Sequence, residues 1–163
     1  MVTGLDEARE RFGHLPLYRV WPEWGSSGIW MPEAIGGTPG PNLTLDGFSI
    51  SGGLRERIAR WQAVFDDQLP EKMWSARDSY ASFSAEGLNI ATQFSRELGE
   101  HALVEYELGE YCAYVWNVLF LAGRCVSTYS AHETIRRSDS STLTLGGSSP
   151  QSARTNEADQ GDD

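Results

Sequence analysis

Cysteine and long apolar runs are scarce in this sequence of 163 residues. Cys112 and Cys125 are the two cysteines, too few for the disulfide framework of a small secreted domain. The longest apolar run, 112–123, has twelve residues, whereas a helix needs ~20 to span a bilayer. The charged N-terminal stretch MVTGLDEARERFGH lacks the apolar core of a signal peptide. We therefore expect a cytoplasmic protein with no membrane partner.

Positive charge is also limited. The chain has 13 Lys and Arg residues against 23 Asp and Glu residues, which gives a formal net charge of −10 and a pI near 4.7. Domains that bind nucleic acids concentrate basic residues in order to displace counterions, so we expect no nucleic-acid partner. A basic protein is a better electrostatic match, although negative charge also keeps an ordinary protein soluble.

The sequence has no recognised motif for a cofactor or a nucleophile. The glycine-rich segments 25–28 and 36–41 match neither common phosphate-binding pattern, and we interpret both as turns. GFSIS at 47–51 differs from GxSxG because it ends in serine. The possible metal ligands have spacings of eleven, thirteen and seven, which match no zinc pattern; they are His101, Cys112, Cys125 and His132. We expect no cofactor, no metal and no catalytic residue.

Apolar periodicity predicts a hairpin followed by two helices. The segments 15–21 and 28–31 are rich in aromatic and branched residues and flank a Gly-Ser-Ser-Gly turn, and 42–45 is a candidate third strand. A first helix, with Ser51 as its N-cap, has one apolar stripe, formed by Leu54, Ile58, Trp61 and Phe65. A second helix ends at Gly99 and has a stripe formed by Phe83, Gly87, Ile90, Phe94 and Leu98.

The segment 102–108 alternates apolar residues with Glu105 and Glu107, which predicts a strand with one buried face and both carboxylates in solvent. The predicted fold is therefore α+β, a small and mainly antiparallel sheet with two helices on one face. We expect a single domain at 15–129, preceded by a leader at 1–14 and followed by a disordered tail at 130–163. Within that domain, periodicity leaves 111–129 open between strand and helix.

Three tryptophans occur in VWPEWGSSGIWM at 20–31. A tryptophan in a strand is usually core, so we expect Trp21 and Trp30 to be shielded. Trp24 lies in the connection beside Glu23, where no periodic pattern buries it, and is a candidate interface anchor. Acidic residues around the link between the helices would add a negative field for a basic partner; they are Asp66, Asp67, Glu71, Asp78 and Glu86.

The stretches LPLYRVWPEW, RWQAVFDD and FSAEGLNIATQFSRELG, followed by VEY, resemble a group of small proteins of high-GC bacteria to which no reaction is assigned. Some members of that group are immunity-type proteins that accompany toxins. The resemblance covers about residues 15–108. It implies a noncatalytic binding protein that neutralises a toxin. The exposed loop tryptophan and the acidic residues near it supply the candidate binding residues; they are Trp24, Glu23, Asp66, Asp67 and Glu71. The alternative is an enzyme with a small-molecule pocket between helices and sheet, and the oligomeric state stays open.

Overall fold

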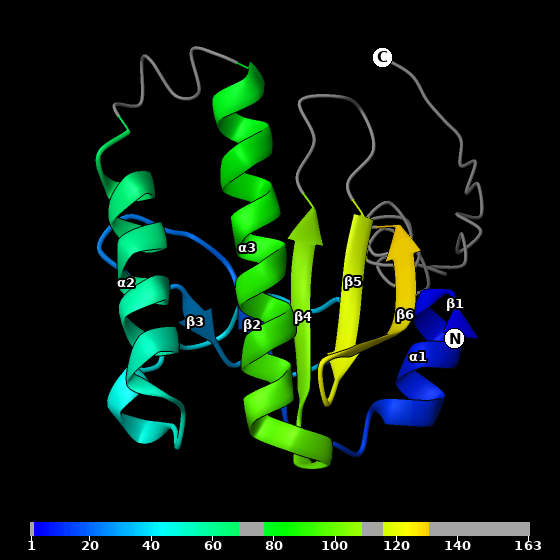
Figure 1. The fold of residues 1–163 in the computed structure, drawn as a ribbon. Coiled ribbons are helices and arrows are strands. Elements are labelled where there is room, and N and C mark those ends of the chain that lie inside the picture. The colour runs from blue at the N-terminus through cyan, green and yellow to red at the C-terminus, as the bar shows by residue number, and fades with distance from the viewer. Residues whose placement is uncertain (1, 69–76, 109–115, 131–163) are drawn as a thin grey trace, which may run out of the picture.

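The computed structural model describes residues 2–68, 77–108 and 116–130, which fold into one sheet with helices on both faces (Figure 1). The helices are α1 (Leu5–Phe12), α2 (Gly52–Asp66) and α3 (Arg77–Leu98), with 3-10 turns at Leu45–Gly47 and Gly99–His101. The strands are β1 (Val2–Thr3), β2 (Leu17–Val20), β3 (Ile29–Trp30), β4 (Leu103–Leu108), β5 (Trp116–Leu121) and β6 (Arg124–Ser130).

The strands are arranged in the order β1-β6-β5-β4-β2-β3. The pairs β2–β3, β4–β5 and β5–β6 are antiparallel, whereas β2–β4 and β1–β6 are parallel. The helices α2 and α3 lie in the long connection that joins the parallel neighbours β2 and β4. The predicted α+β fold, with a mainly antiparallel sheet and two helices on one face, is confirmed.

The predicted apolar stripes of both helices face the sheet. Leu54, Ile58, Trp61 and Phe65 are buried on α2, and Phe83, Ile90 and Phe94 are buried on α3. Together with apolar side chains of β2, β4 and β5 they form the main core. Ser51 caps α2 as predicted, because its hydroxyl accepts a hydrogen bond from the Leu54 N–H at 3.3 Å.

The predicted hairpin is present as β2 and β3, with Val20 opposite Ile29. The candidate third strand at 42–45 is not formed, since only one bridge joins Asn42 to Trp30. Two backbone hydrogen bonds join this segment to the chain at β3, from the Leu43 N–H to the Ile29 carbonyl at 2.9 Å and from the Met31 N–H to the Pro41 carbonyl at 3.1 Å. The pairing goes no further because a 3-10 turn begins at Leu45.

The segment that the sequence left open between strand and helix contains a hairpin, β5 and β6. Its turn uses Ala122 and Gly123, both at positive φ, as a tight two-residue connection requires. The turn lies against α3, because the Gly123 N–H donates to the Ser95 hydroxyl at 3.1 Å. The rest of that segment, 111–115, lies outside the described residues. So does the tail expected at 130–163, apart from Ser130, which ends β6.

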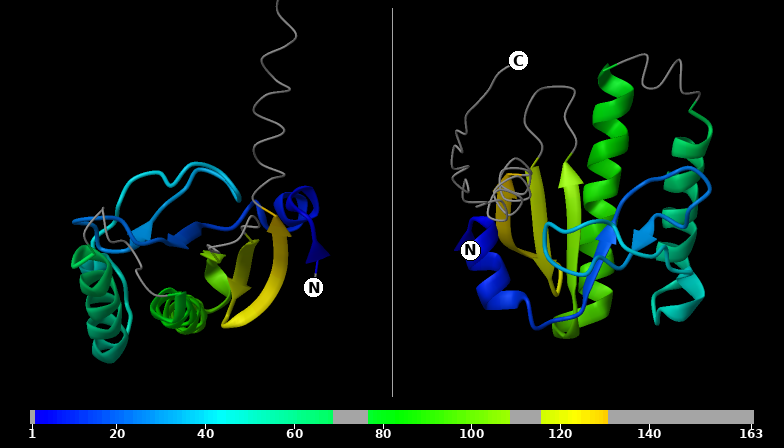
Figure 2. Two further views of the ribbon diagram at one scale, coloured as in Figure 1. Left: turned by 90° about the horizontal axis from the view of Figure 1, so that it is seen from above. Right: turned by 180° about the vertical axis from the view of Figure 1, so that it is seen from behind.

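The helix α1 lies on the opposite face of the sheet from α3 (Figure 2), and a second core lies beneath it. There α1 buries Leu5, Ala8 and Phe12 against apolar side chains of β2, β4, β5 and β6. The helix α1 lies within residues 1–14, the segment expected to be a leader. The boundaries of the single domain at 15–129 stay a prediction.

Candidate functional site

The loop that carries Trp24 is fixed to the C-terminal end of α2. The Gly25 N–H donates to Asp66 Oδ1 at 2.9 Å. The Gln62 amide donates both to the Glu23 carbonyl at 2.7 Å and to Asp66 Oδ1 at 3.0 Å. Residues about forty positions apart in the chain are thus held together, and Gln62, which is buried, connects them.

This docking presents Trp24 at the surface. The Trp24 side chain is 44% exposed, and its ring packs on Phe65 with the centroids 5.2 Å apart. Its indole N–H points to the Gln68 carbonyl at 3.4 Å. Trp21 and Trp30 are half-buried, and the Trp30 indole donates to the Trp21 carbonyl at 2.9 Å. Trp24 is therefore the most exposed of the three.

Four of the five predicted binding residues form one surface, which we call the acidic tip: Glu23, Trp24, Asp66 and Asp67. The three carboxylate residues are exposed around the indole. Glu71, the fifth predicted residue, lies outside the described residues, as does the side chain of Asp78. Glu86, expected in the same acidic field, instead faces α2 and is paired with an arginine there.

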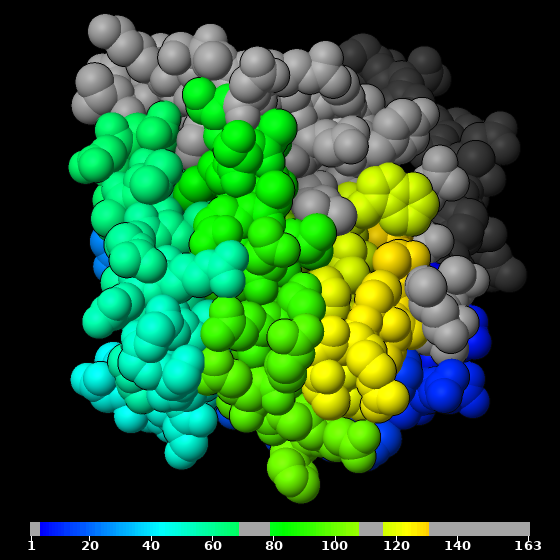
Figure 3. Space-filling view, viewed as in Figure 1, coloured from blue at the N-terminus to red at the C-terminus, as the bar shows by residue number. Residues whose placement is uncertain are grey.

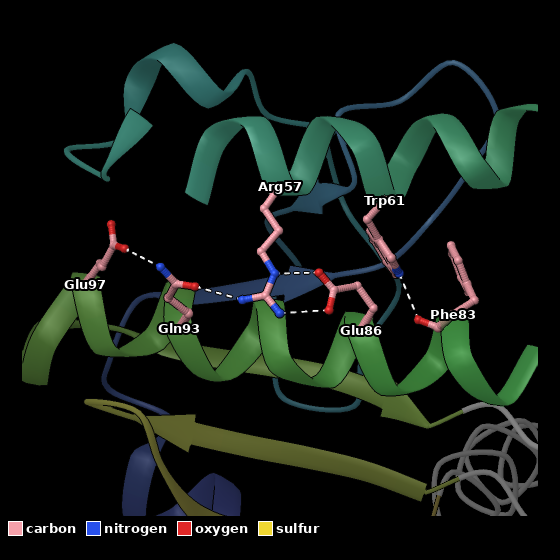
Figure 4. Close-up of polar contacts among 6 residues, drawn as sticks. All are labelled: Arg57, Trp61, Phe83, Glu86, Gln93 and Glu97. Carbon is pink, nitrogen blue, oxygen red and sulfur yellow. Dashed lines mark hydrogen bonds and ion pairs between the residues drawn. The ribbon is translucent and has the colours of Figure 1, made fainter. Parts of the chain in front are cut away.

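That pair belongs to a row of polar contacts between α2 and α3 (Figure 4). The Arg57 guanidinium donates to both oxygens of Glu86, at 2.5 and 2.7 Å, and to Gln93 at 3.0 Å. The Gln93 amide donates to Glu97 at 3.0 Å, and Glu97 also accepts the Ser51 N–H and hydroxyl at 2.6 and 2.8 Å. The row joins the N-cap of α2 to the middle of α3.

These contacts explain why the pKa values of two carboxyl groups, Glu86 and Glu97, are lowered. The hydrogen bonds from Arg57 hold the pKa of Glu86 below its ordinary value, against the effect of partial burial. Partial burial acts to raise the pKa of Glu97, but the hydrogen bonds from Ser51 and Gln93 outweigh it and leave that pKa lowered. Both groups are therefore ionised at neutral pH and hold the two helices in one relative position.

Beyond this row the two helices leave a groove of about 390 Å³ on the outer surface. Figure 3 shows the side of the molecule on which α2 and α3 lie next to each other. Two arginines, one glutamate, two serines and three apolar residues line the groove: Arg57, Arg60, Glu86, Ser79, Ser82, Trp61, Val64 and Phe83. Sequence reasoning did not combine these residues, although the arginine face of the first helix is visible in the sequence.

The prediction that Glu105 is solvated is wrong. Glu105 is fully buried, and it pairs with Arg19, which is 5% exposed. The Arg19 Nε atom donates to Glu105 Oε2 at 2.5 Å, and Glu105 also accepts the Gly36 N–H at 3.0 Å. Burial raises the pKa of Glu105, while the charge and hydrogen bonds of Arg19 oppose that rise.

The second face of β4 is buried because the segment around Ile35 and the helix α1 cover it. Ile35 is 2% exposed and belongs to the same core as α1. Glu107 was also expected to lie in solvent, but it is half-buried on this face. Burial raises its pKa to about 7, with the negative charge of Glu105 acting in the same direction and Arg19 against it.

The possible metal ligands are not brought together within the part of the chain that the structure describes. No group of three or more His, Cys, Asp or Glu side chains suited to a metal occurs among those residues. His101 and Cys125 are both exposed, and Cys112 and His132 lie outside the described residues. Within the same ranges no helix is long and apolar enough to cross a membrane.

Comparison with known families identifies an immunity-type protein. The family described as Serratia CdiI immunity protein-like matches residues 17–108, from the first residue of β2 to the last residue of β4. The match covers more than half of the chain, so the chain belongs to this family. No curated protein matches the chain. The matched range contains both the acidic tip and the groove between α2 and α3, whereas α1, β5 and β6 lie outside it.

Proposed function

We propose that this protein neutralises a toxin by binding it through the acidic tip, without catalysis. Membership of an immunity protein-like family supports a toxin as the partner. The observation that carries the choice of surface is the docking of the Trp24 loop on α2, which places an exposed indole among Glu23, Asp66 and Asp67.

The tip has the chemistry of an interface centre. Tryptophan is enriched among residues that dominate binding energy, and its ring loses few rotatable bonds on binding. The surrounding carboxylates attract a basic surface and accelerate encounter at low ionic strength. The protein also has a net charge of −10, which adds a long-range field of the same sign. A basic surface of the toxin is therefore the partner that fits, and the complex would form in the cytoplasm.

Preorganisation strengthens this proposal. The hydrogen bonds from Gly25 and Gln62 fix the loop before any partner arrives. Binding then does not have to order the loop, which would otherwise cost about 0.5–1.5 kcal/mol for each immobilised side chain. A rigid tip also keeps the indole in one place relative to the carboxylates.

The test first determines whether the region immediately upstream of the gene encodes a toxin-like domain, and then co-expresses that domain with this chain and with its variants. The wild-type chain should restore growth and bind the purified toxin domain in calorimetry. Trp24→Ala should raise the dissociation constant about thirtyfold or more, the equivalent of about 2 kcal/mol. Its melting temperature should fall only slightly, because much of the ring is already in solvent.

Trp116→Ala is the matched control. Trp116 is 46% exposed, nearly the same as Trp24, but it lies at the start of β5, outside the family match. Its loss should leave toxin affinity unchanged. Equal effects of the two substitutions would show that the acidic tip is not the binding surface, and a toxin that the wild-type chain neither binds nor neutralises would refute the function itself.

A further inference from the structure

The groove between α2 and α3 has an apolar floor. The rings of Trp61 and Phe83 are stacked there, with centroids 4.8 Å apart and an interplanar angle of 10°. The Trp61 indole N–H donates to the Phe83 carbonyl at 3.0 Å (Figure 4), so these two rings offer an occupant mainly apolar contacts. Val64 also lines the groove and is 48% exposed, so its side chain is available to an occupant.

Positive charge predominates among the described residues that line the groove. They include two arginines, Arg57 and Arg60, and one carboxylate, Glu86. Both Glu86 oxygens are occupied by the Arg57 guanidinium. Arg60 is exposed one turn further along α2, and its charge acts on Glu86 from a distance. The described lining residues therefore carry a formal charge of +1, from two arginines and one glutamate, on a chain whose net charge is −10.

The groove is connected to the acidic tip by aromatic contacts. Trp24 packs on Phe65, and the Phe65 ring lies 6.0 Å from that of Phe83, centroid to centroid. Phe83 in turn forms the floor of the groove with Trp61. The two surfaces thus border the same cluster of aromatic rings on α2 and α3.

We propose that the groove binds a segment of the toxin that presents an aromatic side chain beside a carboxylate. The ring enters over Trp61 and Phe83 and packs against Val64, while the carboxylate pairs with Arg60. A volume of about 390 Å³ is at the low end of small-ligand pockets, ~300–1,000 Å³, and suits one side chain with its flanking backbone. This inference rests on the proposed function and adds a second, oppositely charged contact to it.

Two contacts of opposite sign would also fix the orientation of the partner. A basic surface over Glu23 and Asp66 and a carboxylate over Arg60 can be satisfied together in one docking pose, while the reversed pose places like charges against each other. The groove would then contribute to the choice of the toxin, and the acidic tip to the speed of association.

The first experiment tests the groove without any toxin. The full chain, labelled with ¹⁵N, is titrated with 3-phenylpropionate and, separately, with 3-phenylpropylamine, up to about 10 mM, since a single side-chain mimic is expected to bind only weakly. The acid should shift the Trp61 indole and Val64 amide signals, and the amine should not. Arg60→Gln should weaken binding of the acid severalfold, while Arg124→Gln, whose parent side chain is 72% exposed at the β5–β6 turn, should not.

Equal binding of acid and amine, no shift with either, or an unchanged titration in Arg60→Gln would overturn the groove chemistry. The second experiment measures the affinity of the toxin domain for Arg60→Glu and Arg124→Glu. We expect a loss of tenfold or more for the first and none for the second. If the wild-type chain binds the toxin and Arg60→Glu binds it equally well, the groove is not part of the interface although the proposed function stands. A toxin that does not bind the wild-type chain refutes the function and removes the toxin as occupant.

Discussion

The two faces of the sheet are held together in different ways. The face under α2 and α3 is filled by apolar and aromatic side chains. On the other face α1 and the segment around Ile35 cover apolar residues, but a buried ion pair of Arg19 and Glu105 lies among them. Apolar packing is nondirectional and depends on the area removed from water, whereas the ion pair depends on a few hydrogen bonds in fixed geometry.

The comparison teaches where each face is vulnerable. On the face under α2 and α3, stability should fall in proportion to the side-chain volume removed. It should also fall when volume is added where the backbones are close. The opposite face should react to the loss of one charge far more than to the loss of both. Four predictions test this difference.

The largest loss of stability is expected at Trp61, on the face under α2 and α3. Trp61→Ala should lower the free energy of unfolding by roughly 3–5 kcal/mol, because burial and ring stacking are lost and a cavity remains. Trp61 is 3% exposed and stacks on Phe83. Urea denaturation measures the change; a variant as stable as the wild-type chain would show that this face does not depend on volume.

The buried pair should show strong nonadditivity. Arg19→Met alone should cost about 3–4 kcal/mol, since Glu105 is left charged and buried. The double variant Arg19→Met, Glu105→Leu should be clearly more stable than either single variant, although the Gly36 N–H and Gly37 carbonyl lose their partners. A double-mutant cycle from urea denaturation provides the coupling energy. Simple addition of the two single losses would contradict the difference between the faces.

A smaller loss of stability is expected when side-chain volume is added at Gly87 on α3. A Cβ atom there would lie 2.3 Å from the Tyr106 hydroxyl and 2.8 Å from the Trp61 ring. Gly87→Ala should therefore destabilise the fold by about 1–3 kcal/mol despite the higher helix propensity of alanine. Thermal unfolding measures it, and Gly52→Ala, at the exposed start of α2 with open space around its Cβ position, is the control. Stabilisation by Gly87→Ala would mean that α3 can move away from the sheet.

The smallest effect concerns pH and the half-buried Glu107. Its pKa in the folded chain is raised to about 7 from an ordinary value of 4.5, so the folded state keeps a proton that the unfolded state has already lost. Stability from this group is therefore lost as the pH rises from about 4.5 to 7. Glu107→Gln should remove that loss and stabilise the chain at pH 8 by about 1 kcal/mol, a figure reduced for solvent screening. Unfolding curves at pH 5 and 8 decide it, and an equal effect at both values would exclude the shift.

The packing of the face under α2 and α3 could be predicted from the sequence because its apolar residues recur at helical spacing. Leu54, Ile58 and Trp61 recur at helical spacing, and their stripe is buried as predicted. Glu105 was misjudged because alternation in a strand indicates only that the two faces differ, and a covering segment far away in the chain decides whether the polar face meets water. The turn-rich segment 36–41 gives no periodic sign that it lies over β4.

The candidate site shows the same division. The exposure of Trp24 follows from its place in a connection, and the structure places it beside Asp66 and Asp67. The residue that holds this docking in place is Gln62, a buried polar residue beside Trp61 on α2. Nothing in the local sequence distinguishes it from a solvated glutamine. The groove was missed for a similar reason, since Arg60 and Val64 become neighbours of Phe83 only when the two helices pack.

The parallel pairing of β2 with β4 has a consequence for how such a protein can diversify. Leu17 lies opposite Leu103 and Val20 opposite Tyr106, so the two strands fix both ends of one long connection. The acidic tip and the groove both lie on that connection, between the end of β2 and the start of β4. Exposed residues there can change without altering any strand register. The sheet thus acts as a constant frame, and new partner preferences can arise by substitution within a single insert between two adjacent strands.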